Sequence, residues 1–71
     1  MNKISPKALL NSKWTKSLVS NKEKHFIVVD VEFNDDQKVT VCIVEAVINQ
    51  RQYEINWRDL KDPTKWKIGW Q

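Results

Sequence analysis

The feature that most constrains this chain is an alternation of apolar residues in its middle third. Ile27, Val29, Val31 and Phe33 stand at every second position, and a second β-branched stretch runs from Val39 to Ile48. A period of two is typical of strands, and β-branched side chains fit a pleated sheet. Residues 24–57 are therefore predicted to form a β-sheet.

Polar segments divide this region into three predicted strands. Asn34 to Gln37 forms a first turn, Gln50-Arg51 a second, and Gln52 to Trp57 a third strand. A two-residue loop at Gln50-Arg51 brings apolar residues together on one face of an antiparallel meander. The expected pairs are Ile48 with Tyr53, Ala46 with Ile55, Val44 with Trp57, Ile27 with Val44, and Val29 with Cys42.

The opposite face of this meander is half apolar and strongly acidic. A fully solvated face does not normally carry many β-branched residues, so we expect the N-terminal arm, the C-terminal tail or a second subunit to cover part of it. The residues on this face are Phe26, Val28, Val41, Ile43 and Val47, mixed with Asp30, Glu32, Glu45 and Glu54.

The two ends of the chain are predicted to be less regular. Ser5-Pro6 has the form of a helix start, with serine as N-cap and proline in the first helical position, and residues 15–23 read as a loop. Asp62-Pro63 favours a short C-terminal helix, whereas the alternation of Trp66, Ile68 and Trp70 favours a strand. Both alternatives stay open.

The predicted fold class is α+β, mostly β: a three-stranded antiparallel meander with a short N-terminal helical turn and a short C-terminal helix or strand. At 71 residues the chain is long enough for a single small domain. It divides into a basic arm (1–23), the β-meander (24–57) and a tryptophan-rich segment (58–71).

Composition excludes several classes of site. One cysteine and one histidine cannot form an internal disulfide or a four-ligand zinc site. No apolar stretch has the length of a membrane span or the form of a signal peptide, which together with the free thiol predicts a cytoplasmic protein. We expect no metal, no cofactor and no membrane association.

Catalysis is not expected either. Cys42 lies in mid-strand on the predicted core face, on the same side as His25, and a buried cysteine usually behaves as a small apolar residue. Glu45 and Glu54 share a face, but carboxylates on a sheet usually pair with lysine or face water. The prediction is a binding module that is not an enzyme.

Charge and tryptophan coincide at both ends of the chain. Residues 1–25 carry a net charge of +5, residues 26–49 carry −4, and residues 50–71 carry +2. Lysine and arginine neutralise phosphates, and indoles stack on unpaired bases. The leading hypothesis is single-stranded nucleic-acid binding, in which Trp66→Ala weakens binding without unfolding the chain. Its predicted contacts are Lys13, Lys16, Arg58, Lys65, Trp66, Lys67 and Trp70.

Two other interpretations compete with this hypothesis. The basic ends can fold back onto the acidic middle, with the tryptophans in the core, as a small domain needs large side chains there. Alternatively the chain is a protein-interaction or homodimerisation module that uses an exposed sheet edge and tryptophan anchors.

The sequence also resembles a family of small tryptophan-rich bacterial proteins of unknown function. The resemblance extends from Ser5-Pro6 to Trp70, covering nearly the whole chain. It departs at Lys16 to Val19 and in the first hairpin turn, where the family usually has a glycine. The resemblance implies no catalytic residue and no ligand. The segments that carry it are Leu9-Leu10, Ser12-Lys13-Trp14-Thr15, Asn21 to Phe26, Cys42 to Val47, Tyr53 to Asp62, Trp66, Gly69 and Trp70.

Overall fold

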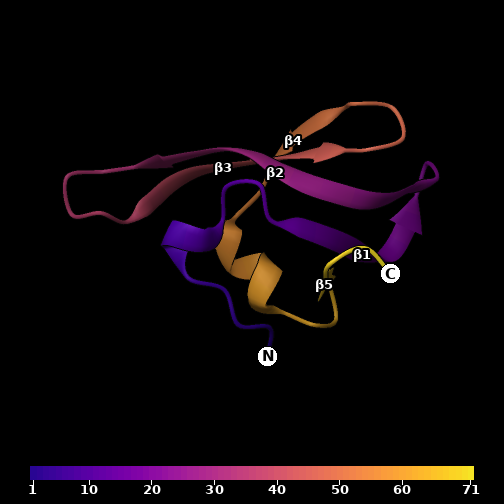
Figure 1. Cartoon of the computed structure of the whole chain (residues 1–71), viewed down its shortest axis with the longest axis horizontal. Coiled ribbons are helices and arrows are strands. Elements are labelled where there is room, and N and C mark those ends of the chain that lie inside the picture. The colour runs from indigo at the N-terminus through magenta and orange to yellow at the C-terminus, as the bar shows by residue number, and fades with distance from the viewer.

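The protein is built on one antiparallel sheet of five strands (Figure 1). The computed structural model describes residues 1–71. The order across the sheet is β4-β3-β2-β1-β5, so the C-terminal strand returns to pair with the first. The alternation of β-branched residues thus predicted a mostly β protein correctly. The strands are β1 (Lys13–Ser20), β2 (Glu23–Phe33), β3 (Val39–Ala46), β4 (Gln52–Glu54) and β5 (Trp66–Ile68).

The structure contains no α-helix, which corrects the α+β prediction to mostly β. Its only helical elements are the 3-10 turns η1 (Pro6–Ala8) and η2 (Trp57–Lys61). Pro6 does begin a turn, but the Ser5 side chain makes no capping hydrogen bond. An isolated helix this short gains too few backbone hydrogen bonds to offset its nucleation cost.

Five strands instead of three result from the two chain ends. Lys13–Ser20 is a strand, so the predicted loop at residues 15–23 was wrong. Of the two C-terminal alternatives, helix or strand, the structure has the strand, Trp66–Ile68. These segments pair with each other, Thr15 lying opposite Lys67. Their strand conformation depends on this long-range pairing, which local propensity does not reveal.

The predicted register between β3 and β4 is wrong by several residues. Val44 lies opposite Tyr53, whereas the sequence had predicted Trp57 there, and β4 ends at Glu54. The connecting loop is longer than two residues because the amide of Gln50 donates to the carbonyl of Ala46 (2.8 Å). Gln50 takes a left-handed φ of 60° in this loop.

The predicted faces of β2 are also partly wrong, because the strand contains a β-bulge. The pairing with β3 shifts between Val28 and Asp30, so Val29 is the extra residue. Phe26 and Val28 are buried in the core, although the alternation had placed them on the opposite face. A bulge reverses the inward and outward positions along a strand, and no local pattern marked this one.

The β2–β3 turn forms without glycine. Gln37 takes a left-handed φ of 60°. The side-chain oxygen of Asn34 accepts hydrogen bonds from the amides of Asp36 (3.0 Å) and Lys38 (2.9 Å). An asparagine side chain that accepts hydrogen bonds from the following backbone amides supports a tight turn. This chain can therefore form the turn without the glycine that the family usually has there.

The core lies on one face of the sheet, which we call the core face. There η2 and the N-terminal segment pack beneath the strands (Figure 1). Asn2 joins the two chain ends, since its side-chain amide donates to the carbonyls of Leu60 (2.9 Å) and Trp66 (2.7 Å). The predicted core positions of β3 are confirmed, and Trp14 is buried beside them. The buried apolar residues are Leu9, Trp14, Phe26, Val28, Cys42, Val44, Ala46, Leu60 and Trp66.

Candidate nucleic-acid interface

The C-terminal tail, Gly69 to Gln71, folds over the opposite, outer face of β1 and β2. The amide of Gly69 donates to the carbonyl of Lys13 (2.9 Å), continuing the β1–β5 pairing. The buried Thr15 hydroxyl donates to the carbonyl of Gly69 (2.7 Å) and accepts from the amide of Gln71 (2.9 Å). One threonine therefore holds the tail on both sides of Trp70.

Trp70 is fixed on this outer face but stays partly open to solvent. Its indole N–H donates to the carbonyl of Phe26 (2.9 Å), and 45% of the residue is exposed. The Lys13 ammonium lies 4.8 Å from the ring centroid, and the His25 ring centroid lies 6.0 Å away. A cation over an indole face is an attractive contact. The result is a held aromatic ring beside a positive charge.

Lys67 extends this cluster along β5. It lies opposite Thr15 in the register, on the face that also carries Lys13, and it is exposed. Side chains at alternate positions of paired strands share a face. Lys13, Lys67 and Trp70, three of the predicted contacts, therefore come together, and we call them with His25 the Trp70 cluster.

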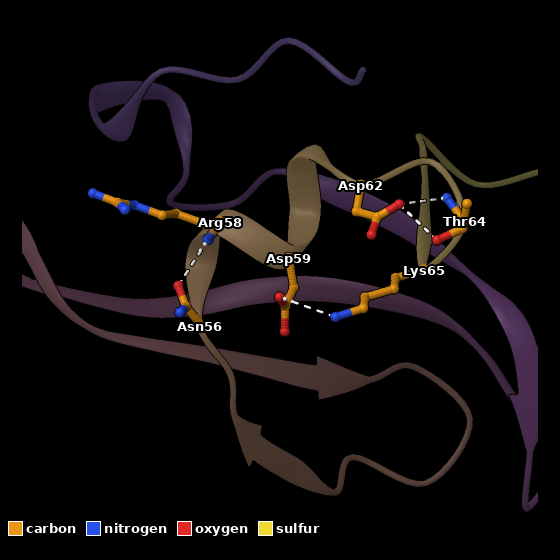
Figure 2. A network of polar contacts seen from close by, with 6 residues as sticks. All are labelled: Asn56, Arg58, Asp59, Asp62, Thr64 and Lys65. Carbon is orange, nitrogen blue, oxygen red and sulfur yellow. Dashed lines mark hydrogen bonds and ion pairs between the residues drawn. The ribbon is translucent and has the colours of Figure 1, made fainter.

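Lys65 and Arg58 lie around η2 (Figure 2), which packs on the core face, whereas the Trp70 cluster lies on the outer face. Lys65 Nζ lies 3.3 Å from Asp59 Oδ1, the only ion pair in the molecule. Arg58 is exposed, and its side chain extends away from that pair in Figure 2. Its amide donates to the Asn56 side chain (3.1 Å), which caps η2. These two predicted contacts do not share a surface with Trp70.

The turn between η2 and β5 is held by Asp62 (Figure 2). Its Oδ1 accepts from the Thr64 hydroxyl (2.6 Å) and the Thr64 amide (2.9 Å). These hydrogen bonds hold the pKa of Asp62 below its ordinary value. The Asp62-Pro63 pair, which had favoured a short C-terminal helix, instead turns the chain into β5.

Trp66 and Lys16 lie on the core face of the sheet. Trp66 is only 6% exposed, and its ring meets Phe26 edge to face at 5.1 Å between centroids. A buried indole offers no open face to a base, so the predicted stacking of Trp66 does not fit the structure. Lys16 is half-buried on the same side, opposite Trp66 in the register.

Cys42 and His25 do not form a pair. Cys42 is buried on the core face, whereas His25 lies on the outer face, where its Nε2 is 2.9 Å from the carbonyl oxygen of Gln71. Burial raises the pKa of the Cys42 thiol to about 11. The thiol is therefore protonated at neutral pH, and the expectation of a shared face was wrong.

Two further observations concern metals and membranes. No three histidine, cysteine or acidic side chains lie near enough to one another to hold a metal ion. None of the helical segments has the length and apolar character needed to cross a bilayer.

The acidic part of the outer face is not neutralised by the basic arm. Glu54 lies opposite Ile43, and Glu45 lies opposite Ile27 in the register, so the predicted mixture of acids and aliphatics is present. None of the acids of that face forms an ion pair. The tail covers only the β1–β2 end, where Trp70 lies. The alternation of Trp66, Ile68 and Trp70 did not reveal this cover, because it puts Trp70 on the same face as the buried Trp66.

The comparisons with known proteins give a family. The model of a family described as tryptophan-rich protein (DUF2389), whose function is unknown, matches residues 12–71. This match covers all five strands. No curated protein matches the chain, and no solved structure does.

Proposed function

We propose that this chain, which belongs to the tryptophan-rich protein family DUF2389, binds single-stranded nucleic acid and is not an enzyme. The observation that carries this proposal is Trp70. It is held by a hydrogen bond to Phe26 but remains 45% exposed, next to Lys13. Single-strand binders combine such stacking platforms with basic side chains.

In this proposal a base stacks on Trp70, and Lys13 and Lys67 contact the flanking phosphates. Lys13 covers part of the ring in the free protein. Its flexible stem lets the ammonium move to a phosphate and leave the ring to the base. Thr15 positions the tail but does not touch the ligand. Lys16, Arg58, Lys65 and Trp66 are left out of the proposed surface.

The experiment is a tryptophan fluorescence titration with mixed-sequence single-stranded DNA and RNA. We expect quenching that weakens steeply between about 50 mM and 200 mM salt, because counterions compete with Lys13 and Lys67. Trp70→Ala should remove most of the binding while the circular dichroism spectrum is unchanged. Lys67→Gln should also weaken binding. Lys38→Gln, in the β2–β3 turn, is its control, because it removes the same charge away from the proposed surface.

Absence of quenching at low salt would contradict the proposal. So would equal weakening by Lys67→Gln and Lys38→Gln, because the effect would then reflect net charge alone. A folded Trp70→Ala variant with undiminished affinity would remove the stacking role.

A different observation favours protein association as the second candidate function. The centre of the outer face carries Ile27, Val29, Val41 and Ile43, all only half-buried. No segment of the chain covers them beyond the tail at Trp70. Exposed aliphatic patches often mark protein interfaces. Concentration-dependent sizing tests self-association, and Ile43→Lys should abolish any dimer that uses this face.

A further inference from the structure

The core face of the sheet is not fully covered by η2. A cavity of about 310 Å³ remains open between the β1–β2 hairpin, β4 and β5. This volume is near the lower end of the range of small-molecule sites. It lies on the opposite side of the sheet from the Trp70 cluster, so it is separate from the proposed nucleic-acid surface.

One wall of this cavity is the carboxylate of Glu23, which is 3% exposed. The Tyr53 hydroxyl lies 2.9 Å from both of its oxygens, and the Asn49 amide donates to Oε2 (2.8 Å). These neutral groups fix the carboxylate but do not neutralise it. No ion pair involves Glu23. Buried carboxylates are rarely left without a cation.

The ionised form of Glu23 is nevertheless the favoured one. The hydrogen bond from Asn49 lowers its pKa most, with help from Tyr53 and from the positive charges of Arg51 and Lys16, while burial acts in the opposite direction. Glu23 therefore presents a negative charge to the cavity at neutral pH.

Three aromatic side chains contribute to the other walls of the cavity. Phe26, Tyr53 and Trp66 line the cavity, and the Phe26 ring centroid lies 5.1 Å from that of Trp66 and 6.3 Å from that of Tyr53. Aromatic rings attract cations and also pack against alkyl chains. Lys16 is the one cationic side chain among the lining residues.

We propose that this cavity, which we call the Glu23 cavity, binds a small organic cation of the alkylammonium class. The ammonium donates to the Glu23 carboxylate, and the alkyl chain lies against Phe26 and Trp66. A simple anion is disfavoured by the negative charge of Glu23. The Lys16 ammonium competes with the ligand for the same charge, so its removal strengthens binding.

The test uses butylammonium as the probe, with butanoate and butanol as matched anionic and neutral chains. In nitrogen–proton correlation spectra of the full chain, butylammonium should shift the indole resonance of Trp66 and leave that of Trp70 in place. Glu23→Gln keeps the size of the side chain but removes its charge, and should weaken binding at least about tenfold. Lys16→Met should tighten binding several-fold.

Three variants separate this proposal from the nucleic-acid proposal and from misfolding. Trp70→Ala should bind butylammonium like the unchanged protein, whatever it does to oligonucleotide binding. Glu32→Gln, on the outer face, removes a carboxylate away from the cavity and should have no effect. Lys16→Met keeps the Glu23 hydrogen bonds, so it tests the cavity even where Glu23→Gln is unstable.

Three results would overturn the proposal. The first is no shift at millimolar butylammonium. The second is equal binding of butanol, which would make the cavity merely apolar. The third is weaker binding in Lys16→Met, which would assign Lys16 to an anionic group of the ligand.

Discussion

The two faces of the sheet use tryptophan in opposite ways. On the core face Trp14 and Trp66 are 1% and 6% exposed and fill the space above η2 and the N-terminal segment. On the outer face Trp70 is 45% exposed and is held by hydrogen bonds of the tail. Lysines adjoin both Trp14 and Trp66 in sequence, yet both rings are buried. Neighbouring charge therefore does not indicate exposure, whereas the strand register does.

The largest expected effect separates the two faces directly. Trp66→Ala removes a buried ring from the contact with Phe26, and should cost about 3–5 kcal/mol of unfolding free energy, enough to unfold a domain of this size. Trp70→Ala removes a half-exposed ring and should cost about 1–2 kcal/mol. Urea unfolding followed by circular dichroism measures both. The expected unfolding by Trp66→Ala replaces the prediction from the sequence that this variant stays folded. Similar losses of unfolding free energy in the two variants would contradict the contrast between the two faces.

The sequence predicted β3 better than β1. The alternation along β3 identifies Cys42, Val44 and Ala46 as buried, because burial depends on residue type and period. In β1, by contrast, lysine, serine and threonine occupy five of the eight positions. Their conformation comes from pairing with β2 and β5 and could not be predicted from local propensity.

The candidate site shows the same limit. Lys13 and Trp70 were both predicted as contacts, but their meeting depends on the β1–β5 pairing. Trp66 was predicted beside them, because it and Trp70 stand four residues apart and would share a face if one strand contained both. The strand ends at Ile68, and Gly69, with a φ of 76°, turns the chain so that Trp70 reaches the outer face. Glycine adopts this conformation without strain.

The second prediction concerns how the tail is held on the outer face. Thr15→Val keeps the shape of this buried side chain but removes both hydrogen bonds to the tail. We expect a loss of about 1–3 kcal/mol in unfolding free energy. Trp70 should become more exposed, which collisional quenching of its fluorescence by acrylamide detects. Ser17→Ala on the same strand, which loses only an exposed hydrogen bond to Pro63, is the control.

The third prediction uses acid to test Glu23 on the core face. Its pKa is lowered in the folded protein from an ordinary value of 4.5, so its contribution to stability is complete above that pH. It is lost as the pH falls below 4.5 through the folded pKa. Unfolding free energy measured against pH should therefore fall less steeply in Glu23→Gln than in the unchanged protein. Parallel curves would show that Glu23 contributes no pH-dependent stability.

Asp62 provides the comparison for that experiment. Its pKa is also lowered, from an ordinary value of 3.8, by hydrogen bonds from Thr64. Its contribution is lost as the pH falls below 3.8, which is lower than the starting point for Glu23. Asp62→Asn should consequently change only the most acidic part of the curve, whereas Glu23→Gln should change it from a higher pH.

The smallest expected effect compares the same contact on the two sides of the molecule. Lys13 lies 4.8 Å from the ring centroid of Trp70 on the outer face, and Lys61 lies 4.5 Å from that of Trp57 in η2. Replacing either lysine by methionine keeps the alkyl packing and removes the cation, which should cost about 0.5–1 kcal/mol in each case. The two variants should thus be nearly equal in urea unfolding. Only Lys13→Met should weaken oligonucleotide binding, because only Lys13 adjoins the exposed ring. Equal binding by both would leave Trp70 as an aromatic cover of the sheet, with no part in recognising a nucleic acid.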